Sequence, residues 1–265
     1  MKMVITFIKN KLRASHAAVK TALSWVNYAV IFTLPPRIKG NPVNPSNATL
    51  FYIHDPMCSW CWGFRPVWQQ LEEQLRDTVN IVYIVGGLAA DSDQPMPSGM
   101  QQALEATWQR IQQQIPGTEF NYDFWRPDSN TQPRRSTYAS CRAVLAAKIQ
   151  DPTLEHEMIL GIQQAYYLSA KNPSNIDALK DVATSIGLQP EQFRHDMASE
   201  TVEMQLQEQL QLARRLSAQG FPSLVLSEGS NEGGNKGDRL HAIPLDYNNS
   251  HTMQQAIVNI TGPAE

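Results

Sequence analysis

The feature that most constrains this chain is a pair of cysteines, Cys58 and Cys61, set between an apolar segment and an amphipathic one. Residues 49–53 combine β-branched and aromatic side chains without a charge, which predicts a buried strand. Residues 61–75 carry apolar side chains at helical spacing, which predicts a helix that starts at the second cysteine. Two cysteines three positions apart at a helix start can close a disulfide with little movement of the backbone.

The segments that follow predict a sheet interrupted by helices. A second strand is expected at residues 80–85, ahead of Gly86-Gly87, and a strand–helix–strand unit of this length implies parallel pairing. Residues 121–135 predict a loop. Helical periodicity predicts five further helices, at residues 99–114, 136–150, 154–169, 175–185 and 190–218.

The C-terminal part returns to strands. Residues 222–227 and 239–243 predict a hairpin, joined by a flexible connection at residues 228–238. Residues 250–260 predict a final helix with Ser250 as its N-cap. The chain is therefore expected to form a small α/β sheet domain split by an all-helical insertion.

Composition narrows the class of protein. With 265 residues, of which 42% are hydrophobic and 18% charged, the chain is expected to be globular with a substantial core. Three cysteines are too few for a disulfide-stapled scaffold, and no second Cys-x-x-Cys completes a tetrahedral zinc site, so no metal is predicted. After residue 54 there are 15 basic and 25 acidic residues, an acidic balance that predicts no nucleic-acid partner.

Residues 1–48 form a separate, basic segment. We expect an extension followed by a turn-rich linker at residues 40–48. A cytoplasmic location is predicted, because mixed residues precede the apolar stretch of the extension and no Ala-x-Ala cleavage site follows it. The alternative is export, or membrane association through residues 1–40.

Cys58 and Cys61 have the spacing of a redox pair. Backbone N–H groups at a helix start stabilise a thiolate on the first sulfur. We expect the Cys58 thiolate to attack a partner disulfide and Cys61 to resolve the mixed disulfide, with Cys58 exposed and Cys61 more buried. Zinc ribbons also use Cys-x-x-Cys, but the strand before the pair and the helix after it favour redox chemistry.

The order of the predicted elements, with Gly220-Phe-Pro222 ahead of a late strand, resembles the DsbA family of the thioredoxin superfamily. More closely, Asp55-Pro-Met-Cys-Ser-Trp-Cys-Trp-Gly-Phe64 resembles the predicted protein-disulfide isomerases and the FrnE-like group, which share a Cys-Ser-Trp-Cys centre. The resemblance implies an α/β, thioredoxin-like fold with an all-helical insertion. It divides the chain into a thioredoxin-like domain at residues 49–94 and 219–265 and an insertion at residues 95–218.

The resemblance also implies a thiol–disulfide oxidoreductase or protein-disulfide isomerase that works through Cys58 and Cys61. Such an enzyme needs no cofactor beyond the cysteine pair, with glutathione as a candidate reductant. Its partners would be protein or small-molecule thiols and disulfides, and its oligomeric state is left open. The family further implies that Pro222 is cis and faces the pair, and that the backbone beside it, at Phe221, binds substrate.

Four other residues are considered for a role beside the pair, and two of them, Trp60 and His54, have two interpretations each. Trp60, between the cysteines, is predicted to contact substrate rather than only to pack. His54, at the end of a strand, is a candidate proton acceptor, against the simpler reading of a structural histidine. Asp55, before a proline, reads mainly as a turn residue. Cys141 is expected to be a buried, inert thiol.

Two other functions stay open. Kappa-class glutathione transferases and hydroxychromene-carboxylate isomerases share the helical insertion and use glutathione with a single Ser or Cys. The second cysteine argues against that type, because a resolving thiol has no role in simple conjugation. The other alternative is a non-enzymatic module whose cysteine pair holds a metal ion together with outside ligands.

Overall fold

The computed structural model describes residues 48–126, 132–229 and 239–262. These residues belong to one compact unit that runs from Val43 to Glu265. Nearly all of the predicted extension at residues 1–48, and most of the predicted connection at residues 228–238, lie outside the described residues.

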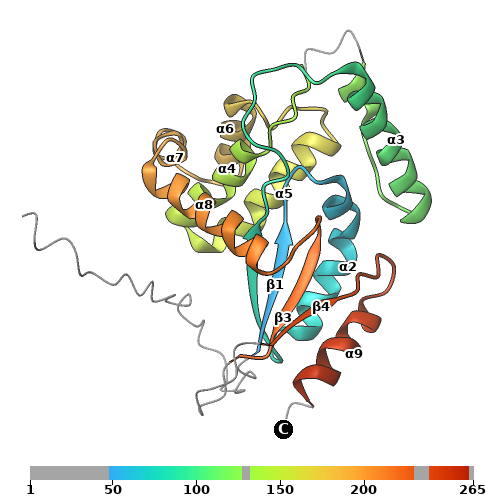
Figure 1. Cartoon of the computed structure of the whole chain (residues 1–265). Coiled ribbons are helices and arrows are strands. Elements are labelled where there is room, and N and C mark those ends of the chain that lie inside the picture. Colours follow the sequence, from blue (N-terminus) through green and yellow to red (C-terminus); the bar gives the residue numbers. More distant parts are fainter. Residues whose placement is uncertain (1–47, 127–131, 230–238, 263–265) are drawn as a thin grey trace, which may run out of the picture. The chain divides into compact units, whose positions relative to one another are not determined.

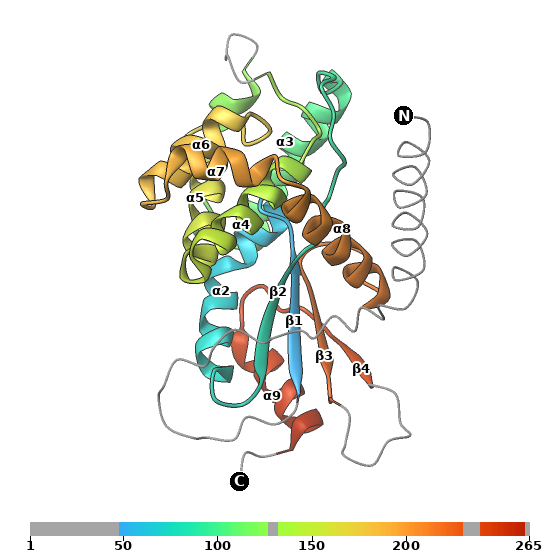
Figure 2. The ribbon, with the colours of Figure 1, turned by 90° about the vertical axis from the view of Figure 1, so that its left-hand side faces the viewer.

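A mixed four-stranded sheet organises this unit, in the order β2-β1-β3-β4. β1 (Thr49–His54) pairs in parallel with β2 (Asn80–Val85) along its whole length. β3 (Ser223–Ser227) runs antiparallel to β1 and to β4 (Leu240–Ile243). Figure 2 shows the four strands side by side in this order. The predicted parallel unit and the predicted C-terminal hairpin are both confirmed.

Alternate residues of β1 divide between two cores, as the period of a strand requires. Tyr52 packs in the core formed with α2 (Ser59–Leu75) and α9 (Ser250–Thr261). Ile53 packs in a second core, where the C-terminal end of α8 (Glu200–Arg215) covers the opposite face. Figure 1 shows α2 and α9 on one side of the strands and α8 on the other.

Every regular element described between residues 98 and 215 is helical, as the predicted insertion requires. No helix in the described ranges is long and apolar enough to cross a membrane. In the described part of the loop expected at residues 121–135 there is a short 3-10 helix. The helices in this part of the chain are α3 (Ser98–Gln114), α4 (Tyr138–Gln150), α5 (Glu155–Tyr167), α6 (Ile176–Ser185), α7 (Pro190–Met197) and α8, with 3-10 turns at Tyr122–Trp125 and Pro152–Leu154.

Two predictions of helix ends were wrong. The expected single helix at residues 190–218 is two helices, because the side chain of Ser199 accepts a hydrogen bond from the N–H of Val202 and starts α8 anew. The N-cap of α9 is Asn249 rather than Ser250, and its side chain accepts from the N–H of His251 at 3.0 Å. In both places a short polar side chain replaces an intrahelical partner.

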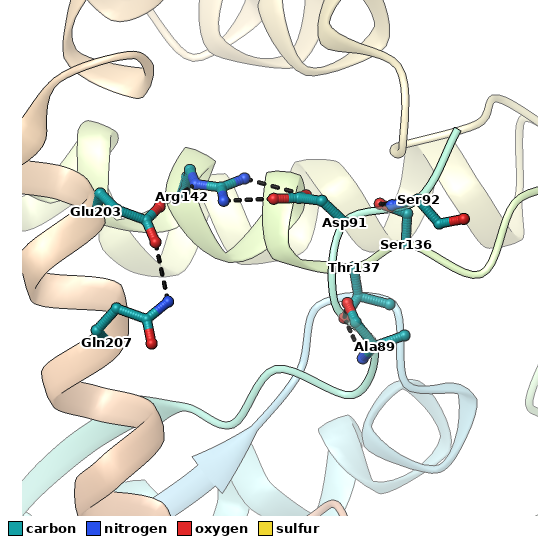
Figure 3. A network of polar contacts seen from close by, with 8 residues as sticks. All are labelled: Ala89, Asp91, Ser92, Ser136, Thr137, Arg142, Glu203 and Gln207. Carbon is teal, nitrogen blue, oxygen red and sulfur yellow. Dashed lines mark hydrogen bonds and ion pairs between the residues drawn. The ribbon is translucent and has the colours of Figure 1, made fainter. Parts of the chain in front are cut away.

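A polar network joins the loop after β2 to the helices of the insertion, as Figure 3 shows. Arg142 on α4 forms ion pairs with Asp91 in that loop and with Glu203 on α8, the latter at 2.8 Å from Nε. Gln207 donates a further hydrogen bond to Glu203 at 2.9 Å. The network fixes the loop between two helices, and that loop leads directly back to β2.

Gly86, directly after β2, lies against the ring of Phe221, which comes two residues before β3. A Cβ atom at position 86 would overlap the Phe221 ring. The end of β2 and the segment before β3 can therefore approach closely only because residue 86 has no side chain.

Gly86→Ala is expected to lower the free energy of unfolding by about 1–3 kcal/mol, because the added methyl group must displace the Phe221 ring. Gly99→Ala is the matched control, since no atom lies within 4 Å of a Cβ there and the residue is in the first turn of α3. We expect that control to be as stable as the wild type or slightly more stable. Urea unfolding followed by circular dichroism measures both, and equal stabilities of the two variants would contradict the close packing.

Candidate active site

Cys58 lies at the N-terminus of α2, after the turn that follows β1. Its backbone is extended, with φ −83° and ψ 116°, and its N–H donates to the carbonyl of Asp55 at 3.0 Å. Its own carbonyl accepts from the N–H of Trp62 at 3.1 Å. Cys58 is therefore the N-cap residue of α2, and its side chain extends from the positive end of the helix dipole.

Both cysteines are buried, although the sequence predicted an exposed Cys58. Cys58 is 5% exposed and Cys61 is fully buried, so the expected order of exposure is right, but the expectation of an exposed Cys58 is wrong. Both residues are free cysteines. Burial, followed by the proximity of Cys58, raises the pKa of the Cys61 thiol well above its ordinary value. Cys61 therefore keeps its proton in the resting protein.

The Phe221–Pro222 peptide bond is cis, as the resemblance implied. The Cys58 thiol donates to the carbonyl of Phe221 at 3.2 Å, although 163 positions separate the two residues. The sheet makes this contact, because β3 follows Pro222 directly and lies beside β1. Cys58, Phe221 and Pro222 are thus brought together, and the predicted substrate contacts of Phe221 and Pro222 stay predictions.

Asp55 joins three parts of the chain through one buried carboxylate. Oδ1 accepts from the N–H of Met57 at 2.8 Å, in the turn before Cys58. Oδ2 accepts from the N–H of Leu88 at 2.7 Å and from the hydroxyl of Thr137 at 2.6 Å. Burial raises the pKa of Asp55, and these three hydrogen bonds oppose that rise. The turn role predicted for Asp55 is confirmed, while its bonds to the loop after β2 and to the start of α4 were not foreseen.

Cys141 is fully buried on α4, as predicted, but it is also a neighbour of the same carboxylate. Its thiol lies 3.7 Å from Oδ2 of Asp55, at the distance of a weak sulfur donor. Burial raises the pKa of the Cys141 thiol well above its ordinary value, so this sulfur stays protonated and unreactive. The sequence offered no signal for the contact, because 86 positions separate the two residues.

Aromatic rings surround the cysteine pair. Trp60 is partly exposed and meets the ring of Tyr247 edge to face, with centroids 5.3 Å apart. Trp62 stacks on Tyr167 at the end of α5, with centroids 5.7 Å and planes 18° apart, and its Nε1 donates to the carbonyl of Glu119. Sequence reasoning missed Tyr167 and Tyr247, which lie on distant segments. The substrate contact predicted for Trp60 stays a prediction.

His54 ends β1 and packs its ring into the aromatic core. It stacks on Tyr52 with centroids 5.2 Å apart, and neither of its ring nitrogens has a hydrogen-bond partner in the described part of the chain. Burial, then the charges of His156 and Lys148, lower the pKa of His54 to about 3. The ring is therefore neutral near pH 7, and its predicted role as proton acceptor stays a prediction.

No group of three or more His, Cys, Asp or Glu side chains within the described ranges is arranged to hold a metal ion. The site holds two thiols, that of Cys58 at the N-terminus of α2 and that of Cys61, fully buried in the first turn of the same helix. Such a dithiol can form and open a disulfide by exchange with a partner.

Asp55→Ala is expected to lower the free energy of unfolding by about 3 kcal/mol or more, because buried donors on three segments lose their acceptor. Asp77→Ala serves as the control, since Asp77 is an exposed residue just after α2. Urea unfolding of both variants measures the difference. A loss no larger than that of the control would show that the three segments are held by other contacts.

His54 should make the protein lose stability as the pH falls. The folded-state pKa of about 3 lies below the ordinary value of about 6.5, so its contribution is complete above pH 6.5 and is lost between about 6.5 and 3. His54→Phe should lessen the loss between pH 7 and pH 5 by about 2 kcal/mol. His195→Gln, at an exposed position, is the matched control, and parallel profiles for His54→Phe and the wild type would contradict the buried, neutral ring.

Comparison with known proteins agrees with this geometry. A sequence model of a thioredoxin family, described as Thioredoxin, matches residues 51–240, which include both cysteines and Pro222. Two curated relatives are named ClpXP adapter protein SpxH. That of Halalkalibacterium halodurans is 25% identical over 66% of this chain and 57% of its own length. That of Bacillus subtilis is 23% identical over 73% of this chain and 62% of its own length. The matches thus span about six-tenths of these relatives.

Two solved structures are similar in fold. A protein from Nitrosomonas europaea, described as a candidate protein disulfide isomerase, superposes with a TM-score of 0.66 at 22% identity, covering 80% of this chain and 96% of that chain. The cytosolic disulfide reductase DsbM from Pseudomonas aeruginosa gives a TM-score of 0.60 at 24% identity, covering 80% of this chain and 98% of that chain. The closer resemblance to the FrnE-like group stays a prediction. The chain belongs to the thioredoxin family, with a DsbA-like α/β fold that carries a helical insertion.

Proposed function

We propose that this protein is a thiol–disulfide oxidoreductase that works through Cys58 and Cys61 as a protein-disulfide isomerase or reductase. The observation that carries the proposal is the hydrogen bond from the Cys58 thiol to the carbonyl before cis-Pro222. It sets the first sulfur of a dithiol at a helix N-terminus and against a backbone segment at the start of β3. A partner disulfide bound along that segment would meet the sulfur directly.

The exchange proceeds in two balanced steps. The Cys58 thiolate attacks one sulfur of a partner disulfide, so a new S–S bond forms, the partner's bond breaks, and the departing thiolate takes up a proton. Cys61 then gives up its proton to the solvent and attacks the Cys58 sulfur, which forms the Cys58–Cys61 disulfide, breaks the mixed disulfide and releases the partner's second thiolate, which takes up a proton. Two electrons pass from the pair to the partner. The reverse steps oxidise a dithiol, and return of the mixed disulfide to a different substrate thiol isomerises the substrate.

The substrates we propose are protein or small-molecule disulfides, with glutathione returning the pair to the dithiol in a reducing, cytoplasmic setting. DsbM, described as a cytosolic disulfide reductase and also solved with GSH, supports this by its similar fold.

A cavity of about 470 Å³ beside α2 supports a protein substrate. Trp62, directly after Cys61, and Tyr247, which contacts the ring of Trp60, are among its lining residues and give it an apolar wall for a substrate side chain.

A glutathione transferase of the kappa or hydroxychromene-carboxylate isomerase type is the first alternative. It would use Cys58 alone and leave Cys61 without a role. Cys61 sits fully buried in the first turn of the same helix, three positions from Cys58, which is the place of a resolving thiol. The metal-binding alternative would need ligands beyond the pair, which the described residues do not cluster around it.

A second candidate function is that of a protein adapter, because the matched curated relatives are named ClpXP adapter proteins. An adapter acts by binding rather than by electron transfer, so its function would survive the loss of both sulfurs. Binding of purified ClpX to the Cys58→Ser/Cys61→Ser double variant, measured by fluorescence anisotropy, separates the two functions. Tight binding that the double variant retains would favour the adapter.

The redox proposal predicts one reversible two-electron transition when the full chain is equilibrated in graded glutathione buffers and its thiols are trapped and weighed by mass spectrometry. The transition should vanish in Cys58→Ser and in Cys61→Ser, with the latter held as a glutathione adduct on Cys58. Cys141→Ser is the matched control and should keep the transition, because this buried thiol is not part of the pair.

Two outcomes would overturn the proposal. A wild-type protein that forms only a glutathione adduct on Cys58 would indicate the transferase type. Stoichiometric zinc in the reduced protein, removed only by a chelator, would indicate the metal-binding module.

A further inference from the structure

Tyr167 carries a buried hydroxyl group for which the described residues offer no hydrogen-bond partner. The residue is the last of α5 and is fully buried. Its hydroxyl oxygen has no hydrogen-bond partner in the described part of the chain. A buried donor that makes no bond carries an unfavourable desolvation free energy, which a state of the protein that supplies an acceptor would remove.

The position of Tyr167 points to the cysteine pair as that partner. Its ring stacks on Trp62, the residue after Cys61, and it belongs to the same buried cluster as Met57, the residue before Cys58. Residues at both ends of the cysteine motif therefore pack in the cluster that contains this ring. The insertion places the ring there, because α5 belongs to the helices between β2 and β3.

The electrostatics agree with this geometry. Burial raises the pKa of Tyr167 first, and negative charge at Tyr166, Cys58, Cys61 and Asp55 raises it further. These are the ionisable groups that act on the hydroxyl from α5, from α2 and from the turn before α2. The hydroxyl therefore keeps its proton throughout the pH range of thiol exchange and is available as a donor.

The resting thiol and the thiolate need different partners. As a thiol, Cys58 donates to the carbonyl of Phe221. As a thiolate it has no proton to donate, and its negative charge is repelled by the same carbonyl oxygen. The charge then requires donors, which the first N–H groups of α2 supply in part. Tyr167 has an unused O–H group packed against the same motif.

We propose that Tyr167, from the helical insertion, is a catalytic residue whose hydroxyl donates a hydrogen bond to the Cys58 thiolate formed during exchange. The inference rests on the proposed function and extends it, because it gives the insertion a part in the redox step. Within the described residues the hydroxyl makes no hydrogen bond in the resting dithiol, and it donates one once Cys58 carries a negative charge.

The test is Tyr167→Phe, which keeps the ring and its stacking on Trp62 and removes only the hydroxyl. The rate of alkylation of Cys58 by iodoacetamide, followed by mass spectrometry across pH, reports the thiolate. We expect the midpoint of this profile to move up by about one pH unit, a tenfold loss of thiolate at a given pH. Thermal stability of the reduced protein should stay the same or rise, because the variant no longer buries an unpaired hydroxyl.

Tyr166→Phe is the matched control, on the adjacent position of α5 and in the same buried cluster. It should leave the alkylation midpoint unchanged. Equal midpoints for Tyr167→Phe and the wild type, with the intramolecular disulfide still forming, would overturn the role of Tyr167 alone, as would equal shifts in both variants. A wild-type protein that forms no disulfide would overturn the proposed function and this inference with it.

Discussion

The buried carboxylate of Asp55 holds together the parts of the chain that make the site. It accepts hydrogen bonds from the turn before Cys58, from the loop after β2 and from the start of α4. A carboxylate removed from water is unfavourable unless donors replace the water, and here donors from three segments do so. The first turn of α2 is therefore fixed by contacts that form only when the sheet and the insertion have both folded.

Contacts between distant segments also bring other groups close to the cysteine pair. The sheet brings Phe221 to Cys58 because β1 and β3 are neighbours, and Gly86 leaves room for the Phe221 ring. The insertion brings Tyr167 under Trp62, while Arg142 ties α4 and α8 to the loop after β2. The thioredoxin-like elements thus supply the nucleophile, and the inserted helices supply much of its surroundings.

Local pattern was enough to predict the strands, the parallel pairing of β1 with β2, the hairpin of β3 and β4 and the cysteine pair, because hydrophobic period and turn residues depend on neighbours in sequence. The pairing of β1 with β3 joins segments far apart in sequence and was not predicted from local pattern. Local pattern also failed where a single polar side chain decided the outcome, as at Ser199, whose hydrogen bond to the N–H of Val202 separates α7 from α8. The contact of Cys58 with Phe221 and the bonds of Asp55 to the loop after β2 and to the start of α4 depend on residues more than 30 positions away, which no local pattern contains. An aspartate next to an uncharged strand was the one hint of a buried polar role.

The low exposure of Cys58 has a consequence for damage by oxidants. Thiols are oxidised first to sulfenic acids and then to sulfinic and sulfonic acids. Their susceptibility follows their thiolate character and their accessibility. Cys58 is largely covered, and Cys61 lies three positions along the same helix, so a sulfenic acid formed on the first sulfur would condense with the second before another oxidant molecule arrived. Peroxide stress would then leave this protein as a reversible disulfide rather than as an irreversibly oxidised one.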